Sequence, residues 1–481
     1  MVTSTMQSPL VATILLAVAS TPAPQDQSDA REAAERTRPN VLFAIADDWG
    51  WPHAGAYGDA VVQTPTFDAL AAGGAFFEAA FVSSPSCTPS RNAILTGQHF
   101  YRLGEGANLW STLAPEHPVF PLLLEDAGYH VGHWRKAWGP GDWKHLGRER
   151  NPAGKRYGSF EAFLAERDGD EPFCFWLGAH DPHRGYEEGS GAASGIDLAA
   201  IELPPYYPDS AAVRGDAADY YFEVQRFDAD VGRALALLEE RGELANTLVV
   251  MTGDHGWPFP RGKTNLYDLG SRVPLAIHWP GEIAPGTRFP DPTSLVNLAP
   301  TILAAAGVEV PANVTGQSLL PRLRGEGFFE GPQFVVLGRE RHTVAQEGHQ
   351  GGYPMRGLRT RDHLLIRNLH PDDWPAGWEA PGNRPFRDCD NGPTKSWILA
   401  HRDEHPDAFA LCFGKRPAVE LYVLADDPFQ VRNVADDPAH AETLARLQTL
   451  LDAELVRTGD PRATGDAEAV EAFTAGQYRG R

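Results

Sequence analysis

The first two thirds of the chain alternate apolar runs with amphipathic stretches. The apolar runs are those of strands covered on both faces, at residues 40–46, 76–82, 129–134, 173–179, 247–252 and 273–279. Helical periodicity predicts helices starting at Thr64 and Asn92, and over 118–127 and 216–241. Strands alternating with helices predict a large, mostly parallel α/β sheet sandwiched by helices.

The pattern changes near residue 326, where short strands follow one another closely. They are predicted at 334–337, 353–359, 363–368 and 420–423, and a helix follows at 440–457. This spacing predicts a smaller C-terminal α+β domain with an antiparallel sheet. We therefore expect a large domain over residues 38–325 and a second one over residues 326–481.

The N-terminus has the pattern of an export signal, although no Lys or Arg precedes its apolar run. That run covers residues 9–19 and is too short to span a membrane, and Ala17-Val18-Ala19 fits a small-x-small cleavage site. We expect a signal peptide over residues 1–19, a polar linker over residues 20–37, and a periplasmic or extracellular product. No later stretch is long and apolar enough to cross a membrane.

Composition adds a strong acidic balance. The formal net charge is −22, from 42 basic and 64 acidic residues. An acidic surface argues against nucleic acid as a partner, and an anionic substrate would need a local basic pocket.

The four cysteines have different contexts. Cys174 lies in an apolar strand and is expected in the core. Cys389 and Cys412 are candidates for a disulfide in an oxidising compartment, with two separate thiols as the alternative. Cys87 stands in a polar segment punctuated by prolines.

Two pairs of polar, ionisable residues follow predicted strands. Asp47 and Asp48 come after 40–46, and Asp254 and His255 come after 247–252. Each pair alone could be a helix cap or a solvated turn. Ligands bind at the carboxyl ends of the strands in such sheets, and carboxylate oxygens suit Ca²⁺ or Mg²⁺.

Residues 85–97 read Pro-Ser-Cys-Thr-Pro-Ser-Arg-Asn-Ala-Ile-Leu-Thr-Gly. The predicted helix places Cys87 at or near a helix N-terminus, where the helix dipole favours an anion, and Arg91 adds positive charge. Taken alone, such a cysteine could be a thiol of low pKa or a buried structural residue.

This string resembles the signature of the type I sulfatases, Cys-x-Pro-Ser-Arg followed by an apolar pair and Thr-Gly. The resemblance implies an alkaline phosphatase-like fold and conversion of Cys87 to formylglycine by a formylglycine-generating enzyme. A hydrated aldehyde can attack a sulfate ester with one hydroxyl and expel sulfate with the other. The resemblance also implies a metal bound by that residue, expected to be Ca²⁺, with Mg²⁺ possible and Zn²⁺ as the alternative. The other implied ligands are Asp47, Asp48, Asp254 and His255.

The same resemblance implies a ring of cations around the reacting sulfate. Lys263 and Lys136 match family lysines, Arg91 would anchor the turn at Cys87, and His180 would bind sulfate or protonate the leaving group. The second family signature has a His where this chain has Trp138. His133 or His145 could supply the missing imidazole, or Trp138 could line a sugar pocket.

Three stretches, at 180–184, 257–267 and 353–361, resemble the N-sulfoglucosamine sulfohydrolase branch of the family. They imply a sulfated saccharide as the substrate. The candidate substrate-binding residues, besides Trp138, are His183, Arg184, Arg339, Arg341, His342 and Arg356.

Two other functions fit the same residues. A phosphodiester or phosphonate monoester hydrolase of the same superfamily can share the metal ligands and the formylglycine. An inactive protein that binds sulfated glycans would follow if the lost signature His removed turnover.

Overall fold

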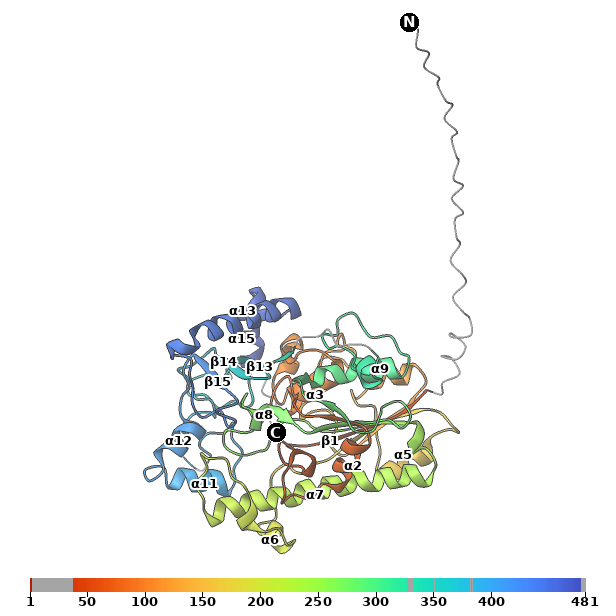
Figure 1. The fold of residues 1–481 in the computed structure, drawn as a ribbon, viewed down its shortest axis with the longest axis horizontal. Helices are drawn as coiled ribbons and strands as arrows, with labels where there is room; N and C mark the ends of the chain where they lie inside the picture. Colours follow the sequence, from red (N-terminus) through yellow and green to blue (C-terminus); the bar gives the residue numbers. More distant parts are fainter. Residues whose placement is uncertain (2–37, 327–332, 350, 381, 383, 477–481) are drawn as a thin grey trace. The chain divides into compact units, whose positions relative to one another are not determined.

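An eight-stranded sheet forms the centre of the computed structural model, which describes residues 1, 38–326, 333–349, 351–380, 382 and 384–476 (Figure 1). The strands lie in the order β10 (Thr287–Phe289), β2 (Ala75–Phe77), β9 (Leu275–His278), β7 (Thr247–Gly253), β1 (Asn40–Ala46), β6 (Phe173–Gly178), β4 (His130–Trp134) and β5 (Lys155–Arg156). β7, β1, β6, β4 and β5 are parallel, whereas β9 is antiparallel to both of its neighbours.

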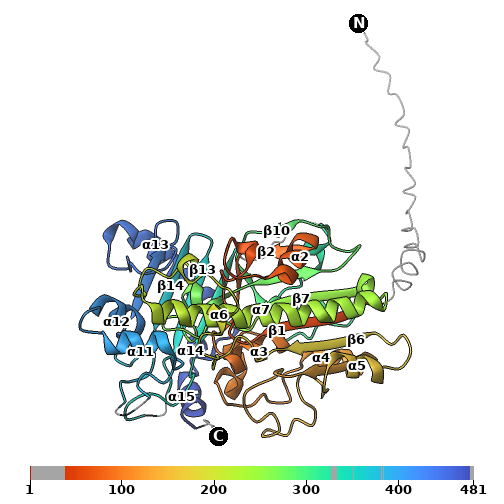
Figure 2. The same cartoon turned by 90° about the horizontal axis from the view of Figure 1, so that it is seen from below.

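Helices cover both faces of this sheet, because its central strand is apolar on both sides. Leu42 and Ala44 of β1 pack into a core shared with one set of helices, and Phe43 and Ile45 pack into a second core on the other face. The first set is α2 (Pro65–Gly73), α5 (Phe160–Glu166) and α7 (Ala211–Glu240), and the second is α3 (Cys87–Thr96), α4 (Phe120–Asp126) and α9 (Leu298–Ala305). Figures 1 and 2 show α7 lying across one face, with α3 and α9 on the other in Figure 1. The predicted α/β sandwich is confirmed.

The long helix α7 begins at Ala211 rather than at the predicted Asp216. The Ser210 side chain accepts a hydrogen bond from the Val213 backbone N–H and so caps the helix there. Its buried stripe includes Val224 and Phe227, as the periodicity predicted.

Two predicted strands are each divided between two sheets. A small sheet contains β11 (Thr293–Ser294), β3 (Ala80–Phe81) and β8 (Arg272–Val273). Pro274 separates β8 from β9, and its missing N–H interrupts the ladder that the apolar run 273–279 had predicted as continuous.

The C-terminal sheet is antiparallel, as predicted, and contains β12 (Phe334–Arg339), β13 (Met355–Thr360), β14 (His363–Asn368) and β15 (Val419–Val423). The helix α13 (Ala441–Thr458) packs Leu447 and Leu451 on one face. The other face packs on Leu266 and Tyr267, from the loop that follows β7. The C-terminal sheet is therefore fastened directly to the segment that follows the carboxyl end of β7.

Several short helices were not predicted from the sequence, because they lack a full apolar stripe. They are α6 (Ser190–Ala193), α8 (Asp268–Ser271), α10 (Leu320–Leu323), α11 (Pro393–Ala400), α12 (Pro406–Phe413), α14 (Pro461–Thr464) and α15 (Ala467–Gly476). No helix within the described residues has both the length and the apolar character to cross a membrane. The signal peptide and linker predicted up to residue 37 lie outside the described part of the chain, and the division at residue 326 stays a prediction.

All four cysteines are free thiols. Cys174 is buried in the core, as predicted. Cys389 and Cys412 are both buried, and burial raises the pKa of each thiol to about 12. The predicted disulfide between them is therefore not formed, and the alternative of two separate thiols holds.

Candidate active site

The candidate active site lies where four parallel strands end side by side. Because Ala46 of β1 pairs with Gly253 of β7, the side chains that follow both strands meet at one edge of the sheet. β6 and β4 lie beyond β1, and they are followed by His180 and Lys136. A side chain at Gly178 would place its Cβ 1.5 Å from the Lys136 carbonyl oxygen, so this approach of the two strand ends requires glycine.

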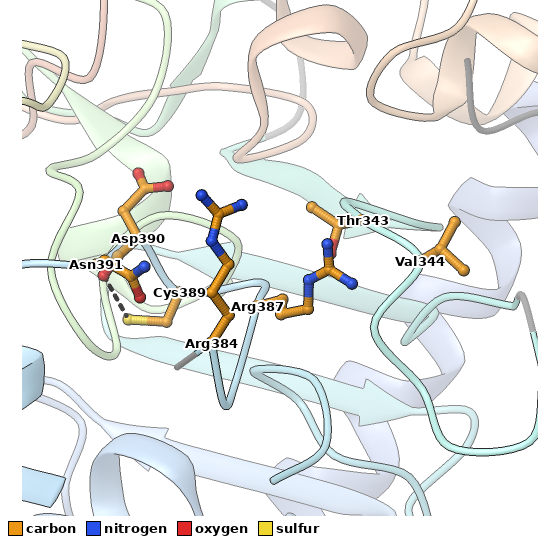
Figure 3. Close-up of a pocket in the computed structure, with 7 residues that line it drawn as sticks. All are labelled: Thr343, Val344, Arg384, Arg387, Cys389, Asp390 and Asn391. Carbon is orange, nitrogen blue, oxygen red and sulfur yellow. Dashed lines mark hydrogen bonds between the residues drawn. The ribbon is translucent and has the colours of Figure 1, made fainter. Parts of the chain in front are cut away.

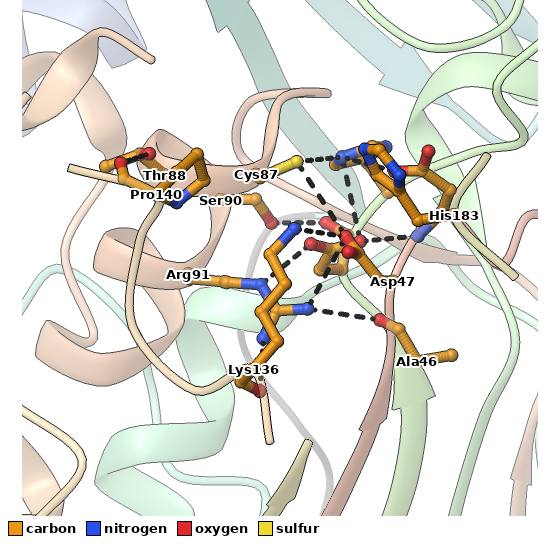
Figure 4. A network of polar contacts seen from close by, with 12 residues as sticks. Ala46, Asp47, Cys87, Thr88, Ser90, Arg91, Lys136, Pro140 and His183 are labelled. Carbon is orange, nitrogen blue, oxygen red and sulfur yellow. Dashed lines mark hydrogen bonds and ion pairs between the residues drawn. The ribbon is translucent and has the colours of Figure 1, made fainter. Parts of the chain in front are cut away.

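Four of the predicted metal ligands form one group of donors. Asp47, Asp48, Cys87 and His255 are all buried, and each offers an atom within 4.8 Å of the others. Cys87 Sγ lies 3.3 Å from His255 Nε2 and 3.8 Å from Asp47 Oδ1. Figure 4 shows Cys87, Asp47, Arg91 and Lys136 converging at this point.

Asp254, the fifth predicted ligand, borders this group. Its Oδ1 accepts a hydrogen bond from the Asp48 backbone N–H over 2.9 Å and lies 3.6 Å from His255 Nε2. Asp48 makes that bond with φ at 74°, a left-handed conformation that is uncommon outside glycine. Strained backbone of this kind is concentrated at functional sites, and Arg135, Arg261 and Thr264 beside the site lysines share it.

Cys87 is the first residue of α3, which is buried along its whole length. The helix therefore begins at Cys87 and not at Asn92, where the sequence predicted its start. Pro89 is tolerated because the first turn of a helix has no internal partners for its N–H groups. Cys87 consequently lies at the positive end of the helix dipole, as predicted.

The other residues of the signature hold this turn against the strand ends. The Ser90 hydroxyl donates to the Asp254 carbonyl oxygen, and Arg91 Nε donates to Asp254 Oδ2 over 2.8 Å. Arg91 also donates to the Ala137 carbonyl oxygen over 2.9 Å, and Thr88 donates to the Pro140 carbonyl oxygen. The signature thus fixes the orientation of Cys87 relative to Asp254 and to the loop after β4.

Two lysines bind different carboxylates of the donor group. Lys136 Nζ donates to Asp47 Oδ1. Lys263 Nζ lies 3.0 Å from Asp48 Oδ2 and 3.1 Å from Asp390 Oδ2. Burial works to lower the pKa of Lys263, but Asp390 and Asp48 outweigh it and raise that pKa well above its usual value.

The carboxylates of the cluster outnumber its arginine and lysine side chains by one, and a protonated His255 balances that difference until a metal ion displaces its proton. Four carboxylates, of Asp47, Asp48, Asp254 and Asp390, are faced by the three fixed cations Arg91, Lys136 and Lys263. Burial lowers the pKa of His255, but the carboxylates of Asp254 and Asp48 outweigh it and raise that pKa to about 9. Asp48 Oδ1 is a buried oxygen without a hydrogen-bond donor. The donor set therefore fits a divalent cation.

Comparison with known proteins identifies the family to which this chain belongs. The sulfatase family model matches residues 39–147 and 157–308. The chain belongs to the sulfatase family. It is therefore an enzyme of sulfate ester hydrolysis, from a family that uses a metal and a formylglycine made from its signature cysteine.

Its relatives are themselves sulfatases. Human N-sulphoglucosamine sulphohydrolase is 30% identical to this sulfatase over 492 residues, which cover 89% of this chain and 92% of the human protein. An ulvan-active sulfatase of Formosa agariphila is 26% identical and covers 90% of this chain and 77% of its own. This sulfatase also superposes on the structure of BT4656 in complex with its substrate D-glucosamine-2-N,6-O-disulfate, with a TM-score of 0.61 and 22% sequence identity. The match covers 89% of this chain and 100% of that chain. This likeness supports the alkaline phosphatase-like fold.

The missing signature imidazole is not replaced by the residues that the sequence suggested. Trp138 is buried in the core of the sulfatase, and its indole Nε1 donates to Asn92 Oδ1. His133 is buried against the Gly154 carbonyl oxygen, 3.1 Å from Nδ1, and burial lowers its pKa to about 4. His145 lies on an exposed loop.

Two further imidazoles near the site come from the loop after β6. His180 is exposed at the rim, and partial burial lowers its pKa against the opposing field of Asp47. His183 offers a nitrogen within 4.8 Å of donor atoms of Asp48 and Asp390. The structure thus brings His183 to the metal-binding edge, where the sequence had placed it only among substrate-binding candidates.

The arginines predicted to bind substrate are buried in ion pairs or hydrogen bonds of the fold. Arg184 forms a bidentate pair with Asp216, at 2.6 and 2.9 Å. Arg356 pairs with Glu340 at 2.6 Å and with Asp460 at 2.7 Å. Arg339 donates to the carbonyl oxygens of three loops, and Arg341 donates to the Thr474 carbonyl oxygen. All four guanidinium groups are therefore engaged by the fold in this structure, and their contact with substrate stays a prediction.

His342 is also buried, and it supports the nucleophile turn. Its Nδ1 lies 2.8 Å from the Ser86 hydroxyl oxygen, immediately before Cys87. Burial and the Lys263 charge lower the pKa of His342 well below its usual value, so the ring is neutral. Its predicted contact with substrate is therefore replaced by a contact with the turn.

Asp390 is the site residue that sequence reasoning missed. It stands in the polar run Asp388-Cys389-Asp390-Asn391, which has no periodicity and drew attention only for its cysteine. Its carboxylate nevertheless reaches Lys263, from a segment more than a hundred residues further along the chain.

Proposed function

We propose that this sulfatase removes sulfate from a sulfated saccharide, with a formylglycine derived from Cys87 as the nucleophile. One observation carries the proposal. Cys87 begins a buried helix, and its Sγ lies within 4 Å of both His255 and Asp47 in a group of four metal-ligand donors. A nucleophile at this position would share its reacting sulfate with the bound cation.

The residues that would hold the metal are Asp47, Asp48, His255 and Asp254, together with the residue at position 87. A hard dication suits these carboxylate oxygens, and Ca²⁺ is the ion we propose, with Mg²⁺ as the alternative. When bound, such an ion polarises a sulfate oxygen, and the aldehyde hydrate supplies the attacking hydroxyl.

Two lysines and one histidine would act on the substrate directly, whereas Arg91 would act through the nucleophile turn. Lys136 pairs with Asp47 and Lys263 with Asp48, and both ammonium groups would neutralise charge that develops on the non-bridging sulfate oxygens. His180, at the exposed rim, would protonate the leaving oxygen or nitrogen as its bond to sulfur breaks. Arg91 is enclosed by Asp254 and backbone carbonyl groups, so it would orient the turn rather than bind substrate.

The substrate class is supported by the relatives. The human relative is named for N-sulfoglucosamine, and the structural neighbour was solved with a glucosamine disulfate. We therefore propose an N- or O-sulfated amino sugar as the first candidate substrate. Ulvan is the second candidate, because one relative is an ulvan-active sulfatase.

Export and maturation belong to the same proposal. The apolar segment before Ala19 supports delivery to the periplasm or the exterior, and the signature around Cys87 supports conversion by a formylglycine-generating enzyme.

The test joins mass spectrometry of the peptide containing Cys87 with sulfate release from N- and O-sulfated oligosaccharides. The protein would be produced together with a formylglycine-generating enzyme, and Cys87→Ala is the control without a nucleophile. We expect conversion, and sulfate release that the control lacks. Release of the phenol from aryl phosphate or aryl phosphonate esters, without sulfate release from sulfated oligosaccharides, would instead indicate the phosphoryl hydrolase. Glycan binding without any turnover by converted protein would indicate the binding protein.

A further inference from the structure

A cleft of about 610 Å³ opens next to the metal-binding edge (Figure 3). Its walls include Thr343, Arg384, Arg387, Asp390 and Asn391, all from the C-terminal part of the chain. Pockets of this volume accommodate a saccharide unit. None of these residues belongs to the donor group around Cys87.

The cleft is joined to the active site through one shared side chain. Asp390 lines the cleft, and its Oδ2 lies 3.1 Å from Lys263 Nζ. The same ammonium lies 3.0 Å from Asp48 Oδ2, in the donor group that contains Cys87. Two ion pairs therefore separate the cleft wall from the donor group. A saccharide whose scissile sulfate lies at Cys87 can extend into this space.

The charge of the cleft comes from two arginines. Arg384 and Arg387 are both exposed, and within the described part of the chain neither guanidinium has an ion pair or a hydrogen bond. Arg339 and Arg356, by contrast, are buried and bonded inside the fold. The Asp390 carboxylate is already paired with Lys263, so the two guanidinium groups leave the cleft positive.

A positive cleft on an acidic protein selects its ligand by charge. The whole chain carries a net charge of −22, so anions are repelled from most of the surface and attracted where cations gather. A guanidinium offers two parallel N–H donors that match the oxygens of a sulfate or a carboxylate. Figure 3 shows the Arg384 guanidinium on the same side of the cleft as the Asp390 carboxylate.

We propose that this cleft binds a second oxyanion of the saccharide, a sulfate or a carboxylate, through Arg384 and Arg387. The inference rests on the proposed function and deepens it. The preferred substrate is then a saccharide with at least two anionic groups, one at the nucleophile and one in the cleft. Arg384 and Arg387 determine specificity and take no part in breaking the sulfate bond.

The test compares three probes in sulfate release. N-sulfoglucosamine carries a single anion, glucosamine-2-N,6-O-disulfate adds a sulfate, and N-sulfoglucosamine linked to a uronic acid adds a carboxylate. We expect the wild-type kcat/KM to be higher for at least one of the probes with a second anion. In the double variant Arg384→Gln/Arg387→Gln, we expect the ratio of that kcat/KM to the value for N-sulfoglucosamine to fall about tenfold, mainly through KM. Arg361→Gln, an exposed arginine on another loop, is the matched control and should keep the ratio.

Calorimetric binding of the same probes to Cys87→Ala protein, with and without the arginine substitutions, gives a readout that needs no turnover. In Cys87→Ala protein with both arginines intact, binding of the disulfate alone more tightly than N-sulfoglucosamine identifies a sulfate subsite. Tighter binding of the uronate probe alone identifies a carboxylate subsite. An unchanged ratio and unchanged affinity in the double variant would overturn the proposal, as would equal losses for all three probes. If converted wild-type protein releases no sulfate, the proposed function is wrong. The calorimetric measurements would still test whether the cleft binds a second anion.

Discussion

The Nε atom of Arg91 lies 2.8 Å from Asp254 Oδ2, and both side chains are completely buried. Arg91→Met would leave the Asp254 carboxylate in the interior without this partner. Loss of one member of a buried pair costs about 3–5 kcal/mol, so we expect a reduction of that size in the free energy of unfolding from urea titrations. Arg288→Met is the control, because Arg288 pairs with Glu78 at the exposed surface and should cost at most about 1 kcal/mol. Equal stability of the two variants would contradict this account.

Lys136 contacts the donor group but is less enclosed, with 13% of its side chain exposed. If it stabilises charge on the transferring sulfate, Lys136→Met should lower kcat about 10²–10³-fold, the effect of removing one preorganised donor. KM should change much less. Lys144→Met removes an exposed lysine and should leave both constants unchanged. A kcat within twofold of the wild-type value would exclude Lys136 from this role.

Asp48 Oδ1 accepts no hydrogen bond and lies 3.2 Å from His255 Nε2, in the donor group where we propose that a cation binds and stabilises the fold. We expect a chelator to lower the Tm, and Ca²⁺ to restore it, since ligand at a hundred times its Kd adds about 2.7 kcal/mol. Asp48→Asn should abolish the response to Ca²⁺, and the exposed control Asp426→Asn should keep it. A parallel titration with Mg²⁺ tests the choice of ion. If the Tm responds to neither ion, the assignment of these carboxylates as metal ligands is wrong.

The stability of the loop that carries His180 should depend on pH. Glu223 on α7 is buried beside Asp181 and Arg226, and burial with the Asp181 charge raises its pKa to about 7. An acid whose folded pKa is raised favours folding fully below its unfolded pKa, near 4.5, and this contribution is lost as the pH rises to about 7.

Glu223→Gln removes the titrating group and should therefore raise the Tm at pH 8 by about 2 °C, with little effect at pH 4.5. Glu239→Gln, an exposed residue of the same helix, provides the comparison. If the Tm values of the two variants change in parallel between pH 4.5 and pH 8, the assignment of this pH dependence to Glu223 is wrong.

The regular parts of the fold were readable from the sequence because their burial is periodic. The run 40–46 is apolar at every position after Asn40, as expected of a strand between two helical layers, and β1 matches the run from end to end. Hydrophobicity alone predicted one strand over residues 273–279, but Pro274 divides this run into β8 and β9. α11 and α12 were missed because short helices at the edge of the core bury only two or three residues each, too few for a recognisable stripe.

For the site, the sequence identified the groups that stand directly after strands. Asp48 and Asp254 were paired correctly because the carboxyl ends of parallel neighbours meet. The ion pairs of the candidate substrate arginines could not be predicted, because the sequence shows that Arg356 is charged but not that Glu340 and Asp460 pair with it. Only tertiary structure reveals which cations are already satisfied.

The distance along the chain between site residues bears on how fast the sulfatase can fold. Asp48 and Asp254 are 206 positions apart, Lys263 and Asp48 are 215 apart, and Arg91 and Asp254 are 163 apart. Contacts this remote require large loops to close before they yield any stabilisation, so high contact order predicts slow folding. The site is completed only when Asp390, more than a hundred positions further along the chain, reaches Lys263. A ligand that needs the whole cluster would therefore report the last stage of folding, long after the central sheet has formed.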